Sequence, residues 1–261
     1  MSPAEIAASA LRVAVSDVAA VEPIKHGLTN ESWLVRTRSD AVVVRISTAS
    51  EDALRIDRPN EASVLAIADA AGVGAPVIRC DPAQRLLVTR YLGPSWSYEE
   101  ARDHANIARA AALLARLHRL DAPGVRTVDL VATVDGYLST LIRYGVGGEL
   151  TQRSLQEQAH AAATLLRRGA AARLCHNDVH HLNVVGGDEL RLIDWEYAGV
   201  GEPLFDLASV CVYHGYDRTR RELLLTSYPA DAGPEVESRF GRALWLFEYI
   251  RDLWTAVREH V

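Results

Sequence analysis

The chain has 261 residues, of which 49% are hydrophobic and 24% charged, a composition typical of a soluble globular protein. A formal net charge of −6 argues against a protein that grips nucleic acid through its phosphates. Three cysteines without a CxxC pair, no signal-peptide pattern and no apolar run near the ~20 residues of a membrane span predict a reduced, cytoplasmic protein that enters no membrane.

The first part of the chain is predicted to form a small sheet with one inserted helix. An N-terminal helix follows a capping-box pattern at Ser2 and Glu5. Alternating and β-branched residues then predict strands, and a helix that ends at Gly72 interrupts them. The expected strands are 21–26, 32–37, 41–47, 77–80 and 85–91, and the expected helix is 60–71.

The second part of the chain is predicted to be mostly helical. A Gly-Pro-Ser sequence at 93–95 is the best candidate for a linker. Beyond it, apolar residues recur with a helical period, except in the segment 174–199. The expected helices are 98–120, 141–144, 155–168, 204–214, 218–228 and 236–260. We therefore predict an α+β protein of two lobes, residues 1–92 and 93–261, with a small-molecule site in the cleft between them.

The non-helical segment 174–199 contains the residues best suited to chemistry. A Gly-Gly-Asp turn at 186–188 joins two short apolar strands into a hairpin. This hairpin would bring Asn183 close to Asp194, with Asp178 on the loop that leads in. Such oxygen ligands suit Mg²⁺, and a free carboxylate can accept the proton of a substrate hydroxyl. Phosphoryl transfer requires this combination of groups.

These motifs resemble a known family. The pattern His176-x-Asp178, followed by four residues and Asn183, resembles the catalytic loop of the choline kinase and aminoglycoside phosphotransferase superfamily, which has a protein-kinase-like fold. The resemblance covers residues 21–216 and is closest to bacterial choline kinase-like proteins. It implies that Asp178 deprotonates the acceptor, that Asn183 and Asp194 hold Mg²⁺, that His176 braces the loop, and that Asp206 supports it.

The same resemblance implies a nucleotide site in the N-terminal lobe. The turn that contains Gly27, Thr29 and Asn30 resembles the family's nucleotide-covering turn, whose backbone N–H groups can bind phosphates. Arg45 occupies the position of the kinase lysine, and an arginine there can also bridge phosphate oxygens. The implied ATP contacts are therefore this turn, Arg45 held by Glu61, and the backbone of Tyr91 and Leu92 around adenine.

The implied acceptor is a small molecule with a hydroxyl group and a positive charge. Choline or a related amino alcohol is preferred, with thiamine or an aminoglycoside as alternatives. Choline kinases surround a quaternary ammonium with aromatic rings, which attract it by cation–π interaction. Helical spacing of aromatic residues is equally typical of core packing, and that interpretation stays open. The candidate acceptor residues are Glu196, Tyr213, Tyr216, Trp245, Tyr249 and Trp254.

Two other classes of function stay open. The cluster His176, Asp178, His180 and His181, joined by Asp194, could bind Zn²⁺ for hydrolysis, although no second His-rich cluster supplies further ligands. A non-catalytic nucleotide-binding protein is the other alternative, and the intact acidic motif argues against it. The sequence leaves the oligomeric state and the choice between ATP and GTP open.

Overall fold

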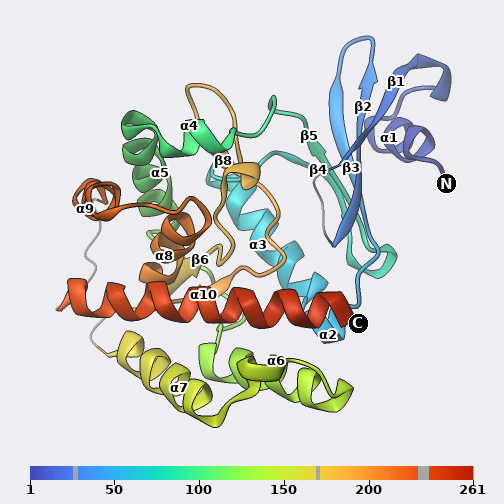
Figure 1. Cartoon of the computed structure of the whole chain (residues 1–261). Coiled ribbons are helices and arrows are strands. Elements are labelled where there is room, and N and C mark those ends of the chain that lie inside the picture. Colours follow the sequence, from blue (N-terminus) through green and yellow to red (C-terminus); the bar gives the residue numbers. More distant parts are fainter. Residues whose placement is uncertain (26–28, 169–170, 229–234, 261) are drawn as a thin grey trace.

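The structure is a computed structural model that describes residues 1–25, 29–168, 171–228 and 235–260 (Figure 1). Near the N-terminus it contains a five-stranded antiparallel sheet of order β1-β2-β3-β5-β4. All five predicted strands are present. Their bounds are Val18–Ile24 for β1, Asn30–Thr37 for β2, Ala41–Ser47 for β3, Val77–Asp81 for β4 and Leu86–Arg90 for β5.

One face of this sheet is covered by a helix, and the other faces the large cleft of the molecule. Helix α1 (Pro3–Leu11) begins at a Ser2 capping box and packs its buried Ile6 against the first face. Because side chains alternate along a strand, neighbouring residues of β3 point in opposite directions. Val44 therefore joins the core beneath α1, and Arg45 lines the cleft.

Two helices connect β3 to β4. The short α2 (Glu51–Leu54) was not predicted, and α3 (Arg58–Ala70) begins where the Asp57 side chain accepts from the Asn60 N–H at 2.9 Å. The buried residues of α3 join the larger core, which is otherwise formed mainly by the second part of the chain. We retain the division into lobes at residues 1–92 and 93–261 as a proposal.

Helices make up most of the second part. The predicted helix 98–120 is two helices, because Asp103 leaves the helical conformation and its side chain caps the second one. The predicted helix 141–144 begins earlier, after an Asp129 cap. The helices are α4 (Tyr98–Arg102), α5 (His104–Leu117), α6 (Leu130–Tyr144), α7 (Arg153–Arg167), α8 (Pro203–Tyr213), α9 (Arg218–Ser227) and α10 (Val236–His260).

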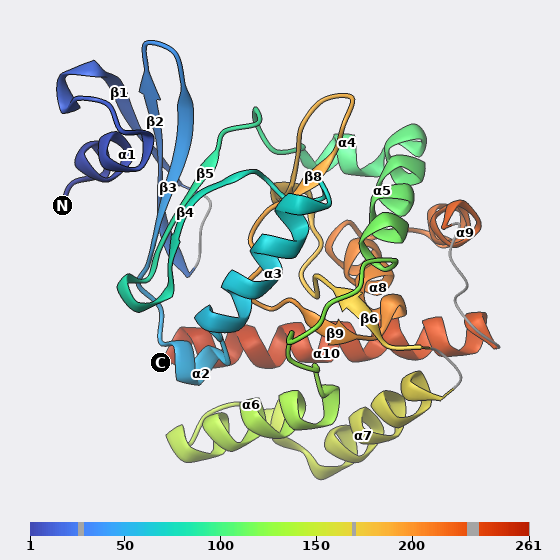
Figure 2. The same ribbon diagram turned by 180° about the vertical axis from the view of Figure 1, so that it is seen from behind.

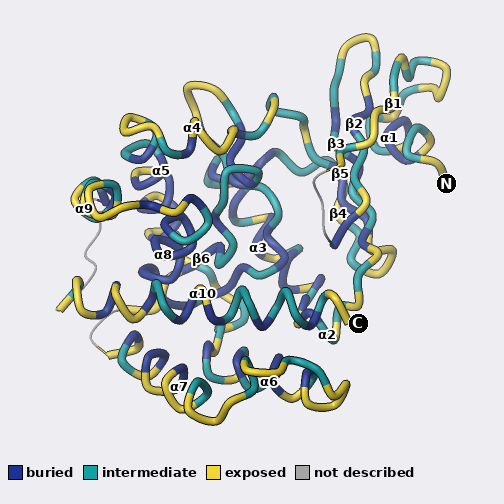
Figure 3. Tube along the Cα trace, in the orientation of Figure 1, coloured by how far each residue is buried: buried dark blue, intermediate teal, exposed yellow. Residues whose placement is uncertain are grey.

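The long helix α10 organises this helical part. It crosses beneath the centre of the molecule, with α8 on one side of it and α6 and α7 on the other (Figures 1 and 2). Buried residues are concentrated around α8, whereas much of α6 and α7 is exposed on the outside (Figure 3). Within the part of the chain that the structure describes, no helix combines the length and apolar character that a membrane crossing needs.

Short strands occupy the predicted non-helical segment. Strand β6 (Arg173–Cys175) pairs with β9 (Gly199–Gly201), and β7 (Val184–Val185) pairs with β8 (Arg191–Leu192) in the predicted hairpin. Single 3₁₀ turns lie at Val15–Asp17, Pro82–Gln84, Gly148–Thr151 and His181–Asn183. The last of these turns leads directly into β7 and places the hairpin at the floor of the cleft.

Candidate active site

A cleft of about 1250 Å³ lies between the sheet and the helical part. The cleft-facing side of β3 and the segment after β5 form one wall, and residues of α6, α8 and α10 form another. The loop after β6 and the segment after β8 form its floor. The three residues on which the predicted chemistry depends, Asp178, Asn183 and Asp194, all line this one cleft.

The hairpin brings these three residues together. The Asn183 amide nitrogen donates to the Asp178 carbonyl oxygen at 3.0 Å and lies 3.4 Å from Asp178 Oδ2. The backbone of Asn183 also accepts from the Ile193 N–H at 3.0 Å, which places Asp194 directly beside it. Asp194 has φ +66°, a left-handed conformation that few residues other than glycine adopt. The surrounding structure of the floor therefore holds Asp194 in a conformation that its backbone does not favour.

Asp178 is held in its ionised form. Its Oδ1 accepts from the Tyr213 hydroxyl at 2.6 Å, and His180 Nε2 lies 3.7 Å from its Oδ2. Burial opposes ionisation of this carboxyl group, but the contacts with His180 and Tyr213 outweigh it and lower the pKa of Asp178. The same contact raises the pKa of His180 against the opposing effect of burial. A carboxylate in this state can accept a proton.

Arg45 joins the sheet to the floor of the cleft. Its Nη2 lies 2.7 Å from Glu61 Oε1, and its Nη1 donates to Asp194 Oδ1 at 3.0 Å. Glu61 also accepts from Arg58 at 2.7 Å. Burial raises the pKa of Asp194, and the carboxylates of Glu61 and Asp178 add to this effect while Arg45 opposes it. The structure thus brings the predicted pair Arg45 and Glu61 together, and extends it to Asp194.

Glu196, a predicted acceptor residue, lines the cleft but is engaged on its nucleotide side. It is buried, and its carboxylate accepts from the Thr29 hydroxyl at 2.7 Å and from the Asn30 amide at 3.0 Å. Arg58 lies 3.1 Å from the same carboxylate. Burial and the nearby Asp194 raise the pKa of Glu196 to about 7, although Arg45 and Arg58 oppose the shift. Glu196 therefore links the nucleotide-side turn to the floor, and an acceptor contact is not supported.

The two other nucleotide-side predictions differ in their outcome. Gly27 lies outside the described residues. Tyr91 and Leu92 follow β5 and line the cleft, where the Tyr91 N–H donates to the Ala41 carbonyl at 3.0 Å. The apolar residues Leu34, Val43 and Leu87 of the sheet face the same region. This wall has the flat apolar character that suits an adenine ring.

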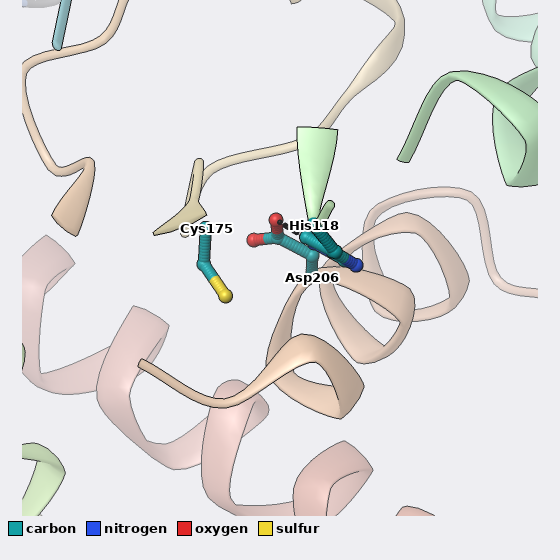
Figure 4. Close-up of side chains that lie close together, drawn as sticks. All are labelled: His118, Cys175 and Asp206. Atoms are coloured by element: carbon teal, nitrogen blue, oxygen red, sulfur yellow. Dashed lines mark hydrogen bonds and ion pairs between the residues drawn. The ribbon is translucent and has the colours of Figure 1, made fainter. Parts of the chain in front are cut away.

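Asp206 on α8 supports the loop that carries Asp178. It is fully buried, and it accepts from the backbone N–H groups of His176 at 2.8 Å and of Asn177 at 2.6 Å. His118, which the sequence analysis did not identify, bonds Asp206 Oδ2 through Nε2 at 2.9 Å (Figure 4). His176 itself contacts the Ile193 carbonyl at 2.9 Å through Nε2. Two buried carboxylate bonds thus fix the loop backbone.

The zinc alternative finds no support in the described residues. Among them, the one group of three metal-ligating side chains is His118, Cys175 and Asp206 (Figure 4), which excludes His180 and His181. Both ring nitrogens of His118 already have partners, Asp206 on one side and the Tyr228 hydroxyl at 2.7 Å on the other. Burial also keeps Cys175 protonated, because it raises the pKa of this thiol well above its usual range. The hydrogen-bonded pair His118 and Asp206 therefore supports the catalytic loop, and Cys175 packs beside it.

The aromatic residues separate into two groups. Tyr213 and Trp254 line the cleft, as does Phe247, whose ring centroid lies 5.4 Å from that of Tyr213. Tyr137 and Tyr197 also line it, and the sequence analysis did not identify them as site residues. The sequence contains little sign of either residue. Tyr137 lies in the part of α6 that was not predicted to be helical, and Tyr197 directly follows the acidic residues Asp194 and Glu196.

The other three aromatic predictions are corrected by the structure. Tyr216 is buried and donates to the Ala101 carbonyl, away from the cleft lining. Trp245 stacks on Tyr249 with ring centroids 5.4 Å apart, and the Tyr249 hydroxyl donates to the Leu150 carbonyl at 2.7 Å. None of the three lines the cleft. The helical spacing of Trp245 and Tyr249 reflects packing outside the cleft, the alternative that the sequence left open, and Tyr216 lies between α8 and α9.

The fold and the acidic floor together define a phosphotransferase. The model of the phosphotransferase enzyme family (APH) matches residues 20–245, and the chain belongs to this family. The predicted resemblance, enzyme class and protein-kinase-like fold are thereby confirmed.

Individual relatives agree in fold. The choline kinase LicA of Streptococcus pneumoniae is 21% identical, with a TM-score of 0.81, and the match covers 98% of this chain and 89% of that one. A choline/ethanolamine kinase family protein of Mesorhizobium loti is 25% identical, with a TM-score of 0.77, over 98% and 86% of the two chains. Protein LicA of Haemophilus influenzae is 26% identical over 244 residues, which are 89% of this chain and 72% of that protein.

Proposed function

We propose that this protein is a Mg·ATP-dependent kinase that transfers the γ-phosphoryl group to the hydroxyl of a small amino alcohol, with choline as the first candidate. The observation that carries the proposal is the convergence of Asp178, Asn183 and Asp194 on one cleft beside Arg45. The similarity to a choline kinase and to a choline/ethanolamine kinase family protein supports the acceptor class.

Asp178 is the proposed base. Tyr213 occupies its Oδ1 at 2.6 Å, whereas Oδ2 has only longer contacts to Asn183 and His180. Oδ2 is therefore the oxygen that would accept the proton of the acceptor hydroxyl. Because the carboxyl group is ionised by its surroundings, it is ready for this role at neutral pH. His176 and Asp206 hold the loop in place through its backbone.

The donor set at the floor suits a magnesium ion. Asn183 donates through its amide nitrogen to the Asp178 backbone, which leaves its amide oxygen as the atom that could ligate a metal. Asp194 supplies a carboxylate, and both are hard oxygen ligands of the kind that Mg²⁺ prefers. When bound, Mg²⁺ neutralises charge on the nucleotide phosphates. Asn183 and Asp194 would hold it, and waters and phosphate oxygens would suit its remaining positions.

The remaining nucleotide contacts are proposed from the sheet. Arg45, which Glu61 holds from behind, would bind phosphate oxygens with its planar guanidinium group. Thr29 and Asn30 would keep the covering turn docked on Glu196. The backbone after β5, at Tyr91 and Leu92, would bind adenine. A structure of LicA in complex with AMP, which is similar to this chain, supports nucleotide binding in such a fold.

The acceptor would lie between Asp178 and the aromatic residues of the opposite wall. Tyr213, Phe247 and Trp254 line that part of the cleft, and their ring faces suit the organic body of an amino alcohol. The proposed partners are therefore a nucleotide and one small hydroxylated molecule.

Release of ADP from Mg·ATP tests this function. The acceptors would be choline, ethanolamine, serine, glycerophosphocholine, thiamine and several aminoglycosides, each compared with an acceptor-free control. One amino alcohol should stimulate release, and Asp178→Asn should lower kcat by about 10³-fold because it removes the general base. The matched control is Asp188→Asn, on the exposed turn of the same hairpin, which should retain normal turnover. Normal turnover in Asp178→Asn, or stimulation by none of the acceptors, would contradict the proposal.

A further inference from the structure

One end of the cleft carries a concentration of positive charge. Arg55 ends α2, Arg126 precedes α6, and Arg258 lies near the end of α10, yet all three line the same cleft. Figures 1 and 2 both place α2 against the C-terminal end of α10. Arg55 also lies over Gly136 of α6, where a Cβ atom would require the Arg55 side chain to move. We refer to Arg55, Arg126 and Arg258 as the arginine end of the cleft.

These arginines have no acidic partner in the described part of the chain. No described carboxylate lies within 4.0 Å of any of the three side chains, whereas Arg45, Arg58 and Arg239 each have one. The Nε atoms of Arg126 and Arg258 are buried without a hydrogen-bond partner. Burial lowers the pKa of Arg126, the Asp57 carboxylate opposes this effect, and Arg55 adds to it. Buried donors left without a partner are costly, and an oxyanion is the group that satisfies them best.

An aromatic ring of the cleft, Trp254, is already engaged by one of these cations. The Arg258 guanidinium carbon lies 5.4 Å from the ring centroid of Trp254, and the Trp254 indole N–H donates to the Tyr197 hydroxyl at 2.7 Å. A quaternary ammonium placed on this ring would meet a permanent positive charge, which repels it. The cationic part of an acceptor therefore fits nearer to Asp178, beside Tyr213 and Phe247.

The geometry points to an acceptor of a particular chemical class. Building on the proposed kinase function, and in place of choline as its first candidate acceptor, we propose that the acceptor is an amino alcohol that also carries an oxyanion, either a carboxylate or a phosphate ester, and that Arg126 and Arg258 bind this anion with Arg55 at the rim. Tyr137, whose hydroxyl donates to the Leu54 carbonyl at 3.3 Å, lines the same cleft. The nucleotide phosphates have a different cation, Arg45, on the opposite wall.

Calorimetric binding to the protein loaded with Mg²⁺ and a non-hydrolysable ATP analogue tests this inference without requiring turnover. Two pairs of probes separate the sources of the anion. Serine differs from ethanolamine by one carboxylate, and glycerophosphocholine differs from choline by a glycerophosphate group that carries the anion. At least one anionic member should bind at least tenfold more tightly than its partner. Arg126→Met should weaken its binding by about 10- to 100-fold, the value expected for a charged hydrogen bond, with Arg126→Lys in between.

Controls keep this test decisive. Arg143→Met, on the exposed surface of α6 outside the cleft, should leave every affinity unchanged. If Arg126→Met does not fold by thermal unfolding, Arg258→Gln provides the same test from α10. Equal binding of both members of each pair would overturn the inference. So would weaker binding of the ATP analogue in the arginine variants, because these side chains would then serve the nucleotide.

The two proposals can fail separately. Absence of ADP release with every acceptor, while the anionic probe still binds through Arg126, would contradict the kinase reaction and keep the anion site. Release that is strongest with choline or ethanolamine, and unchanged in the Arg126 and Arg258 variants, would keep the kinase reaction and overturn the anion site.

Discussion

The floor of the cleft and its acceptor wall are built in different ways. The floor is fixed through its backbone, because Asp206 accepts from the N–H groups of His176 and Asn177, and the Ser209 hydroxyl accepts from the Val179 N–H at 3.1 Å. Both anchoring residues lie on the buried helix α8. The backbone conformation of the floor therefore does not depend on the side chains that face the cleft.

The acceptor wall is instead assembled from side chains on separate helices. Tyr213 of α8 meets Phe247 of α10 by a ring contact, and Trp254 reaches Tyr197 by a single hydrogen bond. Such contacts can change when one side chain changes, while the helices stay in place. The contrast indicates that the floor determines the reaction and that the wall selects the acceptor. Substitutions beneath the floor should alter stability and kcat, and substitutions in the wall should alter KM.

The largest effect is expected beneath the floor, at Asp206. Asp206→Asn replaces a carboxylate oxygen with an N–H donor that faces backbone N–H groups at less than 3 Å. The free energy of unfolding should fall by about 3 kcal/mol, since buried donors lose their acceptor. In the fraction that folds, kcat should fall at least about 100-fold because Asp178 is displaced. Denaturant unfolding and steady-state kinetics measure the two effects.

The same measurements on Asp188→Asn provide the control for Asp206. This residue lies on the exposed turn of the hairpin, so neither quantity should change. If Asp206→Asn changed KM without affecting stability or kcat, the floor would not depend on its backbone anchors. The contrast between the floor and the acceptor wall would then be lost.

Tyr213 contacts both the floor and the acceptor wall, so a substitution there tests whether the two regions act separately. Its hydroxyl donates to Asp178 and helps to lower the pKa of that carboxyl group. In Tyr213→Phe the carboxylate form loses this stabilisation, so the pKa of Asp178 should rise. Because the base must be ionised, the loss of kcat on acidification should begin at a higher pH, by about half a unit to one unit. Near neutral pH, kcat should fall about threefold to tenfold.

A pH profile of kcat for Tyr213→Phe and the unchanged protein decides this point. A rise in acceptor KM with an unchanged acid limb would place Tyr213 in the wall alone. A shifted limb with unchanged KM would place it with the floor, as a residue that positions the base.

Two tryptophans on α10 sharpen the comparison within the wall. Trp254 lines the cleft, whereas Trp245 stacks on Tyr249 outside it. Trp254→Phe removes the indole N–H that reaches Tyr197, and the acceptor KM should rise about fivefold, as the loss of one hydrogen bond predicts. Trp245→Phe should leave KM unchanged. Equal effects of the two substitutions on KM would show that the wall acts through the helix as a whole.

The two regions also differ in how well the sequence predicts them. The hairpin and its flanking motifs are short, so their spacing along the chain places Asp178, Asn183 and Asp194 on one surface whatever the rest of the fold does. The β-branched strands likewise predict the sheet, and alternation along β3 aims Arg45 away from α1. These features depend on local geometry, which the sequence determines directly.

The acceptor wall depends on how distant helices pack, and this cannot be derived from a local pattern. A helical stripe of aromatic residues has two possible neighbours, the core and the cleft, and the sequence does not distinguish them. Trp245 and Tyr249 therefore looked equivalent to Trp254. His118 was missed for the same reason, since its partner Asp206 lies 88 residues away. Glu196 was assigned to the acceptor because the sequence does not reveal its contacts with Thr29 and Asn30, which lie on the other side of the cleft.

The smallest effect is expected at the hydrogen bond between Thr29 and Glu196, which joins two sides of the cleft. Thr29→Val removes the hydroxyl that donates to Glu196 at 2.7 Å and sets a methyl group beside a buried carboxylate. Asn30 and Arg58 still hold this carboxylate, so the free energy of unfolding should fall by only about 1 kcal/mol, and the KM for ATP should rise about threefold. Thr226→Val, on the exposed face of α9, is the matched control and should change neither. If Thr29→Val raised the acceptor KM instead, Glu196 would act on the acceptor after all, and the floor and the wall would have to be treated as one coupled site.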